Sequence, residues 1–338
     1  MTYTARELHL VSRPDGAPTA DNFLLTERRL QRPESGELLV RNLWLSVDPY
    51  MRKRMVDQPS YIAPFGLNAP LEGAAIGVVV ESRDASYAPG DLVSHFSGWR
   101  DLAVIEGASA TRIDPSIEAQ AYLGPLGMPG LAAYVGLLEI GEPKPGETVF
   151  VSAAAGSVGS LVAQIARLKG CHVIGSTGSA AKAHWLRNEA GIDIVINYNE
   201  VDDLTAALTR AAPDGIDVYF DNVGGDHLEA AIDVANDFAR IPLCGMIGQY
   251  NGKPVGPRNI FRAIEKRIKL QGYIVTDHAS RRDALLRDVG QWISDGKIRW
   301  TDTIVDGLAQ MPQAFADLFT GRNTGKMLVR LDAANGDA

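Results

Sequence analysis

Cysteine is scarce in this chain of 338 residues, which contains only Cys171 and Cys244. Two thiols cannot build a disulfide scaffold or a zinc lobe with four cysteine ligands. Residues 1–122 contain only two histidines, His9 and His95, and neither lies in a Gly-His-Glu sequence. Because a catalytic zinc ion needs about three converging Cys, His or acidic ligands, we expect no bound metal.

Long apolar runs and an excess of positive charge are also missing. No segment approaches the roughly 20 apolar residues of a membrane span. The N-terminus has no cationic lead into an apolar core, so we expect no signal peptide and no membrane partner. The net charge is −8, which argues against nucleic acid as a partner because phosphate backbones bind basic surfaces. These absences favour a cytoplasmic protein, and the length favours two domains.

The most informative stretch is Thr148–Gly170. A short apolar run, typical of a buried strand, leads into a turn of small residues, and apolar residues at helical spacing follow. Free amides at the start of such a helix, together with the helix dipole, favour a bound diphosphate. Ala154 replaces the first glycine of the usual three, which leaves Gly156 and Gly159. A tight turn without a ligand is therefore the alternative interpretation.

The rest of the chain predicts an α/β protein with two domains. Residues 1–122 contain short strands separated by Gly and Pro, which favours a barrel-like β-rich domain that residues 298–338 rejoin. Residues 123–297 alternate strands and helices, which predicts a doubly wound parallel (Rossmann) sheet. The strands expected in that sheet are 149–151, 172–176, 194–197, 217–220, 239–243 and 270–275, and expected helices include 204–211, 227–234 and, near the C-terminus, 311–319.

The second of these strands indicates the cofactor. An NAD site usually places an acidic residue about 20 residues beyond the glycines, where it binds the ribose 2′-hydroxyl. No acid occurs between Cys171 and Ala181; the strand ends in Ser176–Ser179, and Lys182 follows. Hydroxyls and a lysine would bind a 2′-phosphate that a carboxylate would repel, so NADP(H) is favoured. The alternative for Lys182 is a solvated helix lysine.

The predicted absence of zinc bears on the reaction. Alcohol oxidation without a Lewis acid lacks its usual means of stabilising the alkoxide. Hydride transfer to an activated C=C bond needs only hydrogen-bond donors for the developing enolate. The residues therefore favour reduction of a conjugated double bond.

Several longer motifs together are more specific than the glycine turn. In chain order they are SVDPYMR at 46–52, GMPGLAAY at 127–134, AAAGSVGSLVAQIARLKG at 153–170, INY at 196–198, YFDNVGG at 219–225, CGMIGQYN at 244–251, LQGYIV at 270–275 and GRNTGKMLV at 321–329. With these motifs the sequence resembles the zinc-independent medium-chain dehydrogenase/reductases, in the branch of the prostaglandin reductases and the bacterial NADPH-dependent curcumin reductases.

The resemblance implies a GroES-like catalytic domain, a Rossmann domain that binds NADPH, and reduction of the α,β double bond of enones and enals such as curcumin, prostaglandin-like ketones and alkenals. It also implies a homodimer. Carried over by position, Tyr250 and Tyr50 are the implied catalytic donors. The implied cofactor contacts are Gly156, Ser157, Val158 and Gly159 at the diphosphate, Lys182 and Tyr198 at the 2′-phosphate, and Asn222, Cys244, Tyr250, Tyr273, Ile274, Val275 and Asn323 elsewhere.

Alternatives remain at this stage. The chain could be a quinone reductase of the same superfamily, or a sensor that binds NADPH without turnover. Tyr50 and Tyr250 could serve only for packing. Cys244 is expected to pack as a small apolar residue and Asp221 to form a turn. No partner can be named for His95, for which a surface or core role is expected.

Overall fold

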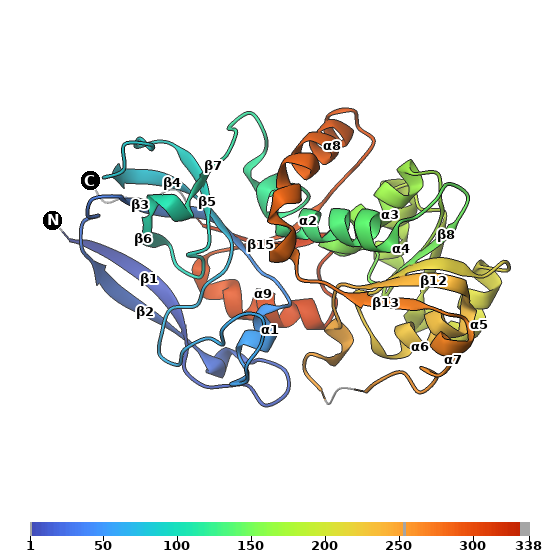
Figure 1. Ribbon diagram of the computed structural model, residues 1–338. Coiled ribbons are helices and arrows are strands. Elements are labelled where there is room, and N and C mark those ends of the chain that lie inside the picture. Colours follow the sequence, from blue (N-terminus) through green and yellow to red (C-terminus); the bar gives the residue numbers. More distant parts are fainter. Residues whose placement is uncertain (1, 253–254, 332–338) are drawn as a thin grey trace. The chain divides into compact units, whose positions relative to one another are not determined.

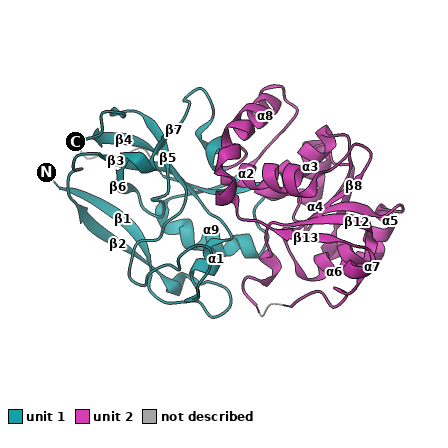
Figure 2. Cartoon of the chain, viewed as in Figure 1, with its two compact units in different colours: residues 1–123, 302–338 teal, residues 124–301 magenta. Residues whose placement is uncertain are grey.

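The computed structural model describes residues 2–252 and 255–331. The chain divides into two compact units, residues 1–123 with 302–338 and residues 124–301 (Figure 2). We call them unit 1 and unit 2. Residue 1 and residues 332–338, at the ends of the predicted domain ranges, lie outside the described residues.

Unit 2 contains a parallel six-stranded sheet (Figure 1). Its strand order is β10 (Ile194–Asn197), β9 (His172–Thr177), β8 (Thr148–Val151), β11 (Ile216–Phe220), β12 (Ala235–Leu243) and β13 (Lys269–Gly272). The order reverses between β8 and β11, and ligands of doubly wound sheets bind at such a switch point, beyond the carboxyl ends of the strands. The predicted doubly wound sheet is confirmed.

Helices cover both faces of this sheet (Figure 1). Those of unit 2 are α2 (Met128–Val135), α3 (Ser157–Leu168), α4 (Ala180–Asn188), α5 (Leu204–Ala211), α6 (Gly225–Val234), α7 (Arg262–Glu265) and α8 (Arg282–Ser294). Most of α3 is buried, whereas Leu208 of α5 and Leu228 of α6 pack on Phe150 and its neighbours on the opposite face. The apolar strands are thus buried on both sides, as a parallel sheet requires.

The last strand of the sheet is shorter than the sequence predicts. Strand β13 ends at Gly272, and the chain turns into a 3₁₀ helix at Val275. The Tyr273 hydroxyl donates to the carbonyl of Ala132 at 2.7 Å. Its side chain is therefore held by the preceding part of unit 2, and residues 273–275 follow the strand instead of extending it.

Unit 1 contains a mixed seven-stranded sheet and a two-stranded antiparallel sheet. The larger sheet runs β14 (Asp302–Asp306), β15 (Lys326–Arg330), β3 (Glu37–Ser46), β4 (Ala75–Ser82), β5 (Leu92–His95) and β7 (Thr111–Arg112), with β6 (Leu102–Glu106) also paired to β3. Strands β1 (Tyr3–Leu10) and β2 (Phe23–Leu30) form the smaller sheet.

The core of unit 1 joins segments from both ends of the chain. Trp99 is fully buried, stacks on Phe23 and meets Phe315 edge-on. Phe315 lies on α9 (Met311–Phe319), and the short helix α1 (Met51–Arg54) contributes Met51 to the same core. Among the described residues, no helix is long and apolar enough to cross a membrane.

Candidate functional site

The turn before α3 has the geometry of an anion site. Gly156 is the N-cap, its conformation is extended, and no side chain caps the helix. Ser160 donates its amide back to the carbonyl of Gly156, so the amides of Ser157, Val158 and Gly159 are the ones that lack an intrahelical acceptor. A Cβ on Gly159 would lie 2.3 Å from the carbonyl oxygen of Ala153, so only glycine fits there. The sequence brings these amides to the carboxyl end of β8.

The structure also explains why alanine is tolerated at the first glycine position. Ala154 is fully buried, and a Cβ built on Gly175 of β9 would lie 2.8 Å from its methyl group. The space that a side chain at Gly175 would occupy is therefore taken by Ala154. The turn has alanine at its first glycine position, and the neighbouring strand β9 has Gly175 opposite that alanine.

The residues predicted for the 2′-phosphate follow β9 and β10, Lys182 on α4 and Tyr198 directly after β10. Ser179 caps α4, accepting the amide of Lys182 at 3.3 Å. The Lys182 side chain is half-buried, and this burial lowers its pKa. The Tyr198 hydroxyl packs against the loop, because a Cβ on Gly178 would lie 2.5 Å from it. No acidic residue occurs in the sequence from Cys171 to Lys182.

At the switch point the ends of β8 and β11 are joined by hydrogen bonds. The Ser152 hydroxyl accepts the amide of Asn222 at 2.9 Å, and the Asn222 side chain donates to the Ser152 carbonyl at 2.8 Å. One carboxylate oxygen of Asp221 accepts the Tyr219 hydroxyl and the amides of Val223 and Gly224. Burial raises the pKa of Asp221. Asp221 therefore forms the turn, as predicted, and Ser152 and Asp221 fix the orientation of Asn222.

Cys244 and Tyr250 lie in the loop after β12. The Cys244 amide donates to the Asp221 carbonyl at 2.9 Å, which ties this loop to the end of β11. Burial raises the pKa of the Cys244 thiol to about 11, so a thiolate nucleophile is disfavoured. The Tyr250 hydroxyl accepts the amide of Met246 at 3.4 Å. This bond holds the tyrosine side chain against its own loop.

Tyr273 and Asn323 are also among the predicted cofactor contacts, and the structure shows how their side chains are held. A side chain on Gly136 would lie 2.3 Å from the Tyr273 hydroxyl, so the ring of Tyr273 is packed inside unit 2. Only the backbone of 273–275 then suits a cofactor contact. Asn323 belongs to unit 1, and its side chain donates to the Gly325 carbonyl at 2.9 Å.

Tyr50 also belongs to unit 1, at the start of α1. Its hydroxyl oxygen is buried and has no hydrogen-bond partner among the described residues. Burial, reinforced by nearby Asp48, raises the pKa of this hydroxyl far above its usual value. Tyr50 therefore remains a neutral hydrogen-bond donor at any physiological pH.

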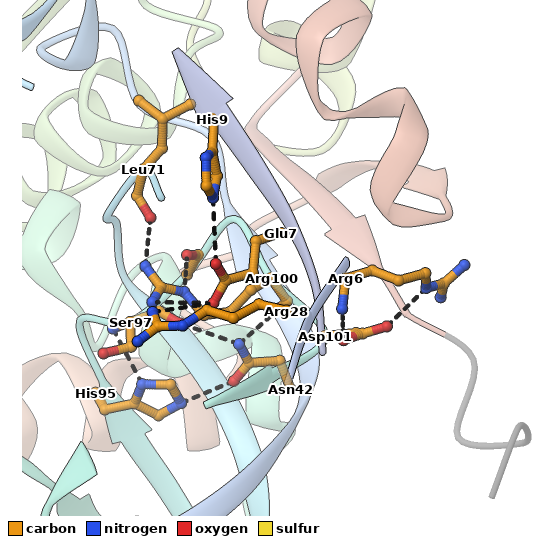
Figure 3. Close-up of polar contacts among 11 residues, drawn as sticks. Arg6, Glu7, His9, Arg28, Asn42, Leu71, His95, Ser97, Arg100 and Asp101 are labelled. Carbon is orange, nitrogen blue, oxygen red and sulfur yellow. Dashed lines mark hydrogen bonds and ion pairs between the residues drawn. The ribbon is translucent and has the colours of Figure 1, made fainter. Parts of the chain in front are cut away.

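The histidines of unit 1 take part in structural hydrogen bonds (Figure 3). His95 accepts the Ser97 amide on Nδ1 at 3.1 Å, so Nε2 carries the proton and donates to Asn42 Oδ1 at 2.8 Å. His95 is buried, and its partner Asn42 could not be named from the sequence because it lies on β3, 53 residues earlier in the chain. His9 contacts the buried carboxylate of Glu7 at 3.2 Å (Figure 3). Within residues 2–252 and 255–331, no three His, Cys, Asp or Glu side chains are grouped so as to hold a metal ion.

Comparison with known proteins places the chain in a family. Residues 6–113 match the family model described as the N-terminal domain of oxidoreductase, and residues 157–289 match that described as zinc-binding dehydrogenase. The chain is 41% identical to the NADPH-dependent curcumin reductase of Escherichia coli, covering 95% of each protein. It is 39% identical to prostaglandin reductase 1 of Rattus norvegicus, covering 94% of this chain and 96% of the relative.

A solved structure agrees with these relatives. The crystal structure of CurA from Vibrio vulnificus in complex with NADPH superposes with a TM-score of 0.92 at 41% identity, covering 97% of this chain and 99% of that one. The predicted resemblance is confirmed. The chain belongs to the medium-chain dehydrogenase/reductases, in the branch of NADP-dependent oxidoreductases that contains the prostaglandin reductases and the bacterial curcumin reductases.

Proposed function

We propose that this protein reduces the α,β C=C bond of enones and enals with NADPH. The observation that carries the proposal is the acid-free loop after β9, where Ser179 caps α4 three residues before Lys182 and the Tyr198 hydroxyl packs against Gly178. This arrangement suits a dinucleotide that carries a 2′-phosphate. The relatives named as curcumin and prostaglandin reductases support the substrate class.

The residues would hold the cofactor at three points. The amides of 157–159 would bind the diphosphate, Lys182 and Tyr198 would bind the 2′-phosphate, and Asn222 would contact the dinucleotide with Cys244 and the backbone of 273–275. When bound, NADPH supplies a hydride for the β-carbon of the substrate.

Negative charge then develops on the carbonyl oxygen of the substrate. The Tyr250 and Tyr50 hydroxyls are the candidate donors to this oxygen, and one well-placed donor lowers such a barrier by about 2.7–4 kcal/mol. The Met246 amide donates to the Tyr250 hydroxyl, and Tyr50 is the N-cap residue of α1. Water or a tyrosine would protonate the α-carbon.

A steady-state screen of NADPH oxidation tests the proposal. Graded enals, enones and quinones are compared, and enones or enals are expected to be turned over much faster than quinones. Tyr250→Phe and Tyr50→Phe are expected to lower kcat more than they change KM. NADPH binding without turnover of any of these compounds would refute the proposal and support a sensor; selective quinone turnover would support a quinone reductase.

The assembly and location belong to the same proposal. We infer a homodimer that works in the cytoplasm. Mass measurement in solution tests the dimer. A monomer at micromolar concentration would contradict that part alone.

A further inference from the structure

A buried ion pair lies inside unit 1, between segments from opposite ends of the chain. The Lys326 ammonium donates to Asp48 Oδ1 at 2.8 Å and to the Val47 carbonyl at 2.7 Å. Lys326 is 3% exposed and Asp48 8% exposed. The other carboxylate oxygen of Asp48 accepts the Ser46 hydroxyl. Both charges are thus removed from water and hydrogen-bonded, which is the only arrangement in which burial of such a pair is tolerated.

The two partners adjoin two of the candidate site residues. Asp48 is followed by Pro49 and Tyr50, and its carbonyl accepts the Met51 amide that begins α1. Lys326 is the first residue of β15 and directly follows Gly325, whose carbonyl accepts the Asn323 side chain. A single ion pair therefore ties the turn that carries Tyr50 to the turn that carries Asn323.

A second carboxylate faces the same lysine. Asp302 of β14 is paired in register with Lys326, so the two side chains lie on one face of the sheet. Its Oδ1 is buried and has no hydrogen-bond partner among the described residues. Of these two acidic residues, Asp48 is the one that is hydrogen-bonded to the Lys326 ammonium.

We propose that Lys326 and Asp48 are positioning residues, which hold Tyr50 and Asn323 in register for the reaction. The proposal rests on the proposed reductase function. A buried ion pair adds little to stability compared with apolar residues of the same size, but it accepts only one geometry. The pair therefore acts through Tyr50 and Asn323, and neither charge contacts the substrate.

A double-mutant cycle tests the link to Tyr50. Asp48→Asn keeps the shape and removes the charge, and Tyr50→Phe removes the hydroxyl that the pair is proposed to position. Each is expected to lower kcat for an enone, Asp48→Asn by about tenfold. The double variant should be no slower than Tyr50→Phe alone, within about twofold, because both changes act on one hydroxyl. Losses that multiply, or an unchanged kcat in Asp48→Asn, would overturn the proposal.

Matched variants separate positioning from folding. Asp306→Asn removes the exposed ion pair that joins β14 to Arg330 of β15 and is expected to leave kcat and KM unchanged. If Asp48→Asn does not fold, Ser46→Ala replaces it in the cycle, since it removes one hydrogen bond to Asp48 and keeps both charges. Ser46→Ala is expected to lower kcat by about threefold. It should cause no further loss of kcat in the Tyr50→Phe background. Independent losses would count against the proposal in the same way.

Measurement of NADPH binding tests the positioning role separately from the reductase function. If the wild-type protein turns over no enone or enal, the proposed function fails and NADPH dissociation decides the positioning role. Lys326→Met is then expected to weaken NADPH binding at least threefold relative to Asp306→Asn through displacement of Asn323, and Lys326→Arg to restore part of it. Equal dissociation constants for Lys326→Met and Asp306→Asn would overturn the positioning role.

Discussion

Replacement of Lys182 by alanine should change the choice between NADPH and NADH. Lys182 follows the Ser179 cap of α4, and its side chain is half-buried. NADH lacks the 2′-phosphate that the ammonium is proposed to bind. The variant should therefore bind NADPH more weakly and NADH with unchanged affinity.

The magnitude follows from the kind of contact that is lost. A hydrogen bond to a charged group contributes about 1.5–3 kcal/mol, which corresponds to about 10- to 150-fold in a dissociation constant. Partial exposure of Lys182 lets solvent screen the charge. We therefore expect a loss near the lower end, about 10- to 30-fold, and a steeper loss in low salt than in high salt.

Dissociation constants for both nucleotides, measured by quenching of protein fluorescence, check this expectation. Lys297→Ala is the matched control, because Lys297 is 53% exposed, pairs with Asp295 and changes the net charge equally. If Lys182→Ala keeps an NADPH-to-NADH ratio within twofold of the wild type, the 2′-phosphate is not bound there. If Lys297→Ala shifts the ratio as much as Lys182→Ala, net charge is responsible instead of a specific contact.

Three further predictions concern the turn before α3 and two buried titratable groups. Gly159→Ala should weaken NADPH binding at least tenfold, because its Cβ would lie 2.3 Å from the Ala153 carbonyl; unchanged affinity would show that α3 can shift freely. Burial lowers the pKa of His95 to about 3 from 6.5, so its contribution to stability is present above pH 6.5 and lost as pH falls towards 3. The loss of stability reaches about 2–3 kcal/mol at pH 4.5. Urea unfolding of His95→Gln should accordingly show a smaller loss between pH 7 and 4.5 than the wild type. Burial raises the pKa of Asp302 to about 7 from 3.8, so its contribution to stability is present below pH 3.8 and lost as pH rises through 7. Asp302→Asn should therefore raise the free energy of unfolding by about 1–2 kcal/mol at pH 8, after allowance for solvent screening, and by less at pH 5. An equal gain at both pH values would refute this titration.

The fold of unit 2 could be predicted from the sequence because local signals and tertiary packing agree there. The predicted bounds of α5, 204–211, and of β10, 194–197, are those of the structure. Asp203 explains the first case, since its carboxylate caps α5 by accepting the Ala206 amide at 3.0 Å. In unit 1 the hairpin β1–β2 was not predicted. Strand β2 is mostly exposed between its two ends, so it lacks the apolar alternation that identifies a strand.

The place of a candidate site residue in the fold could be predicted where the residue follows directly from a strand or a turn. Gly159 and Lys182 are of this kind, since each stands at a fixed distance from a glycine turn or an N-cap. Ser152 was missed, although it directly follows β8, because its role depends on Asn222, which is distant in the chain. The partner of His95 was missed for the same reason.

The Lys326–Asp48 pair shows the limit of reading residues one at a time. Lysine at the start of a strand and aspartate before proline are each typical of exposed positions. What buries them is the pairing of β15 with β3, in which Leu328 lies opposite Ser46. That register moves Lys326 onto the turn after Ser46, where the Val47 carbonyl and Asp48 accept its protons. A one-residue slip would turn the ammonium to the other face of the sheet, so the geometry of the Tyr50 turn depends on the register of a strand from the opposite end of the chain.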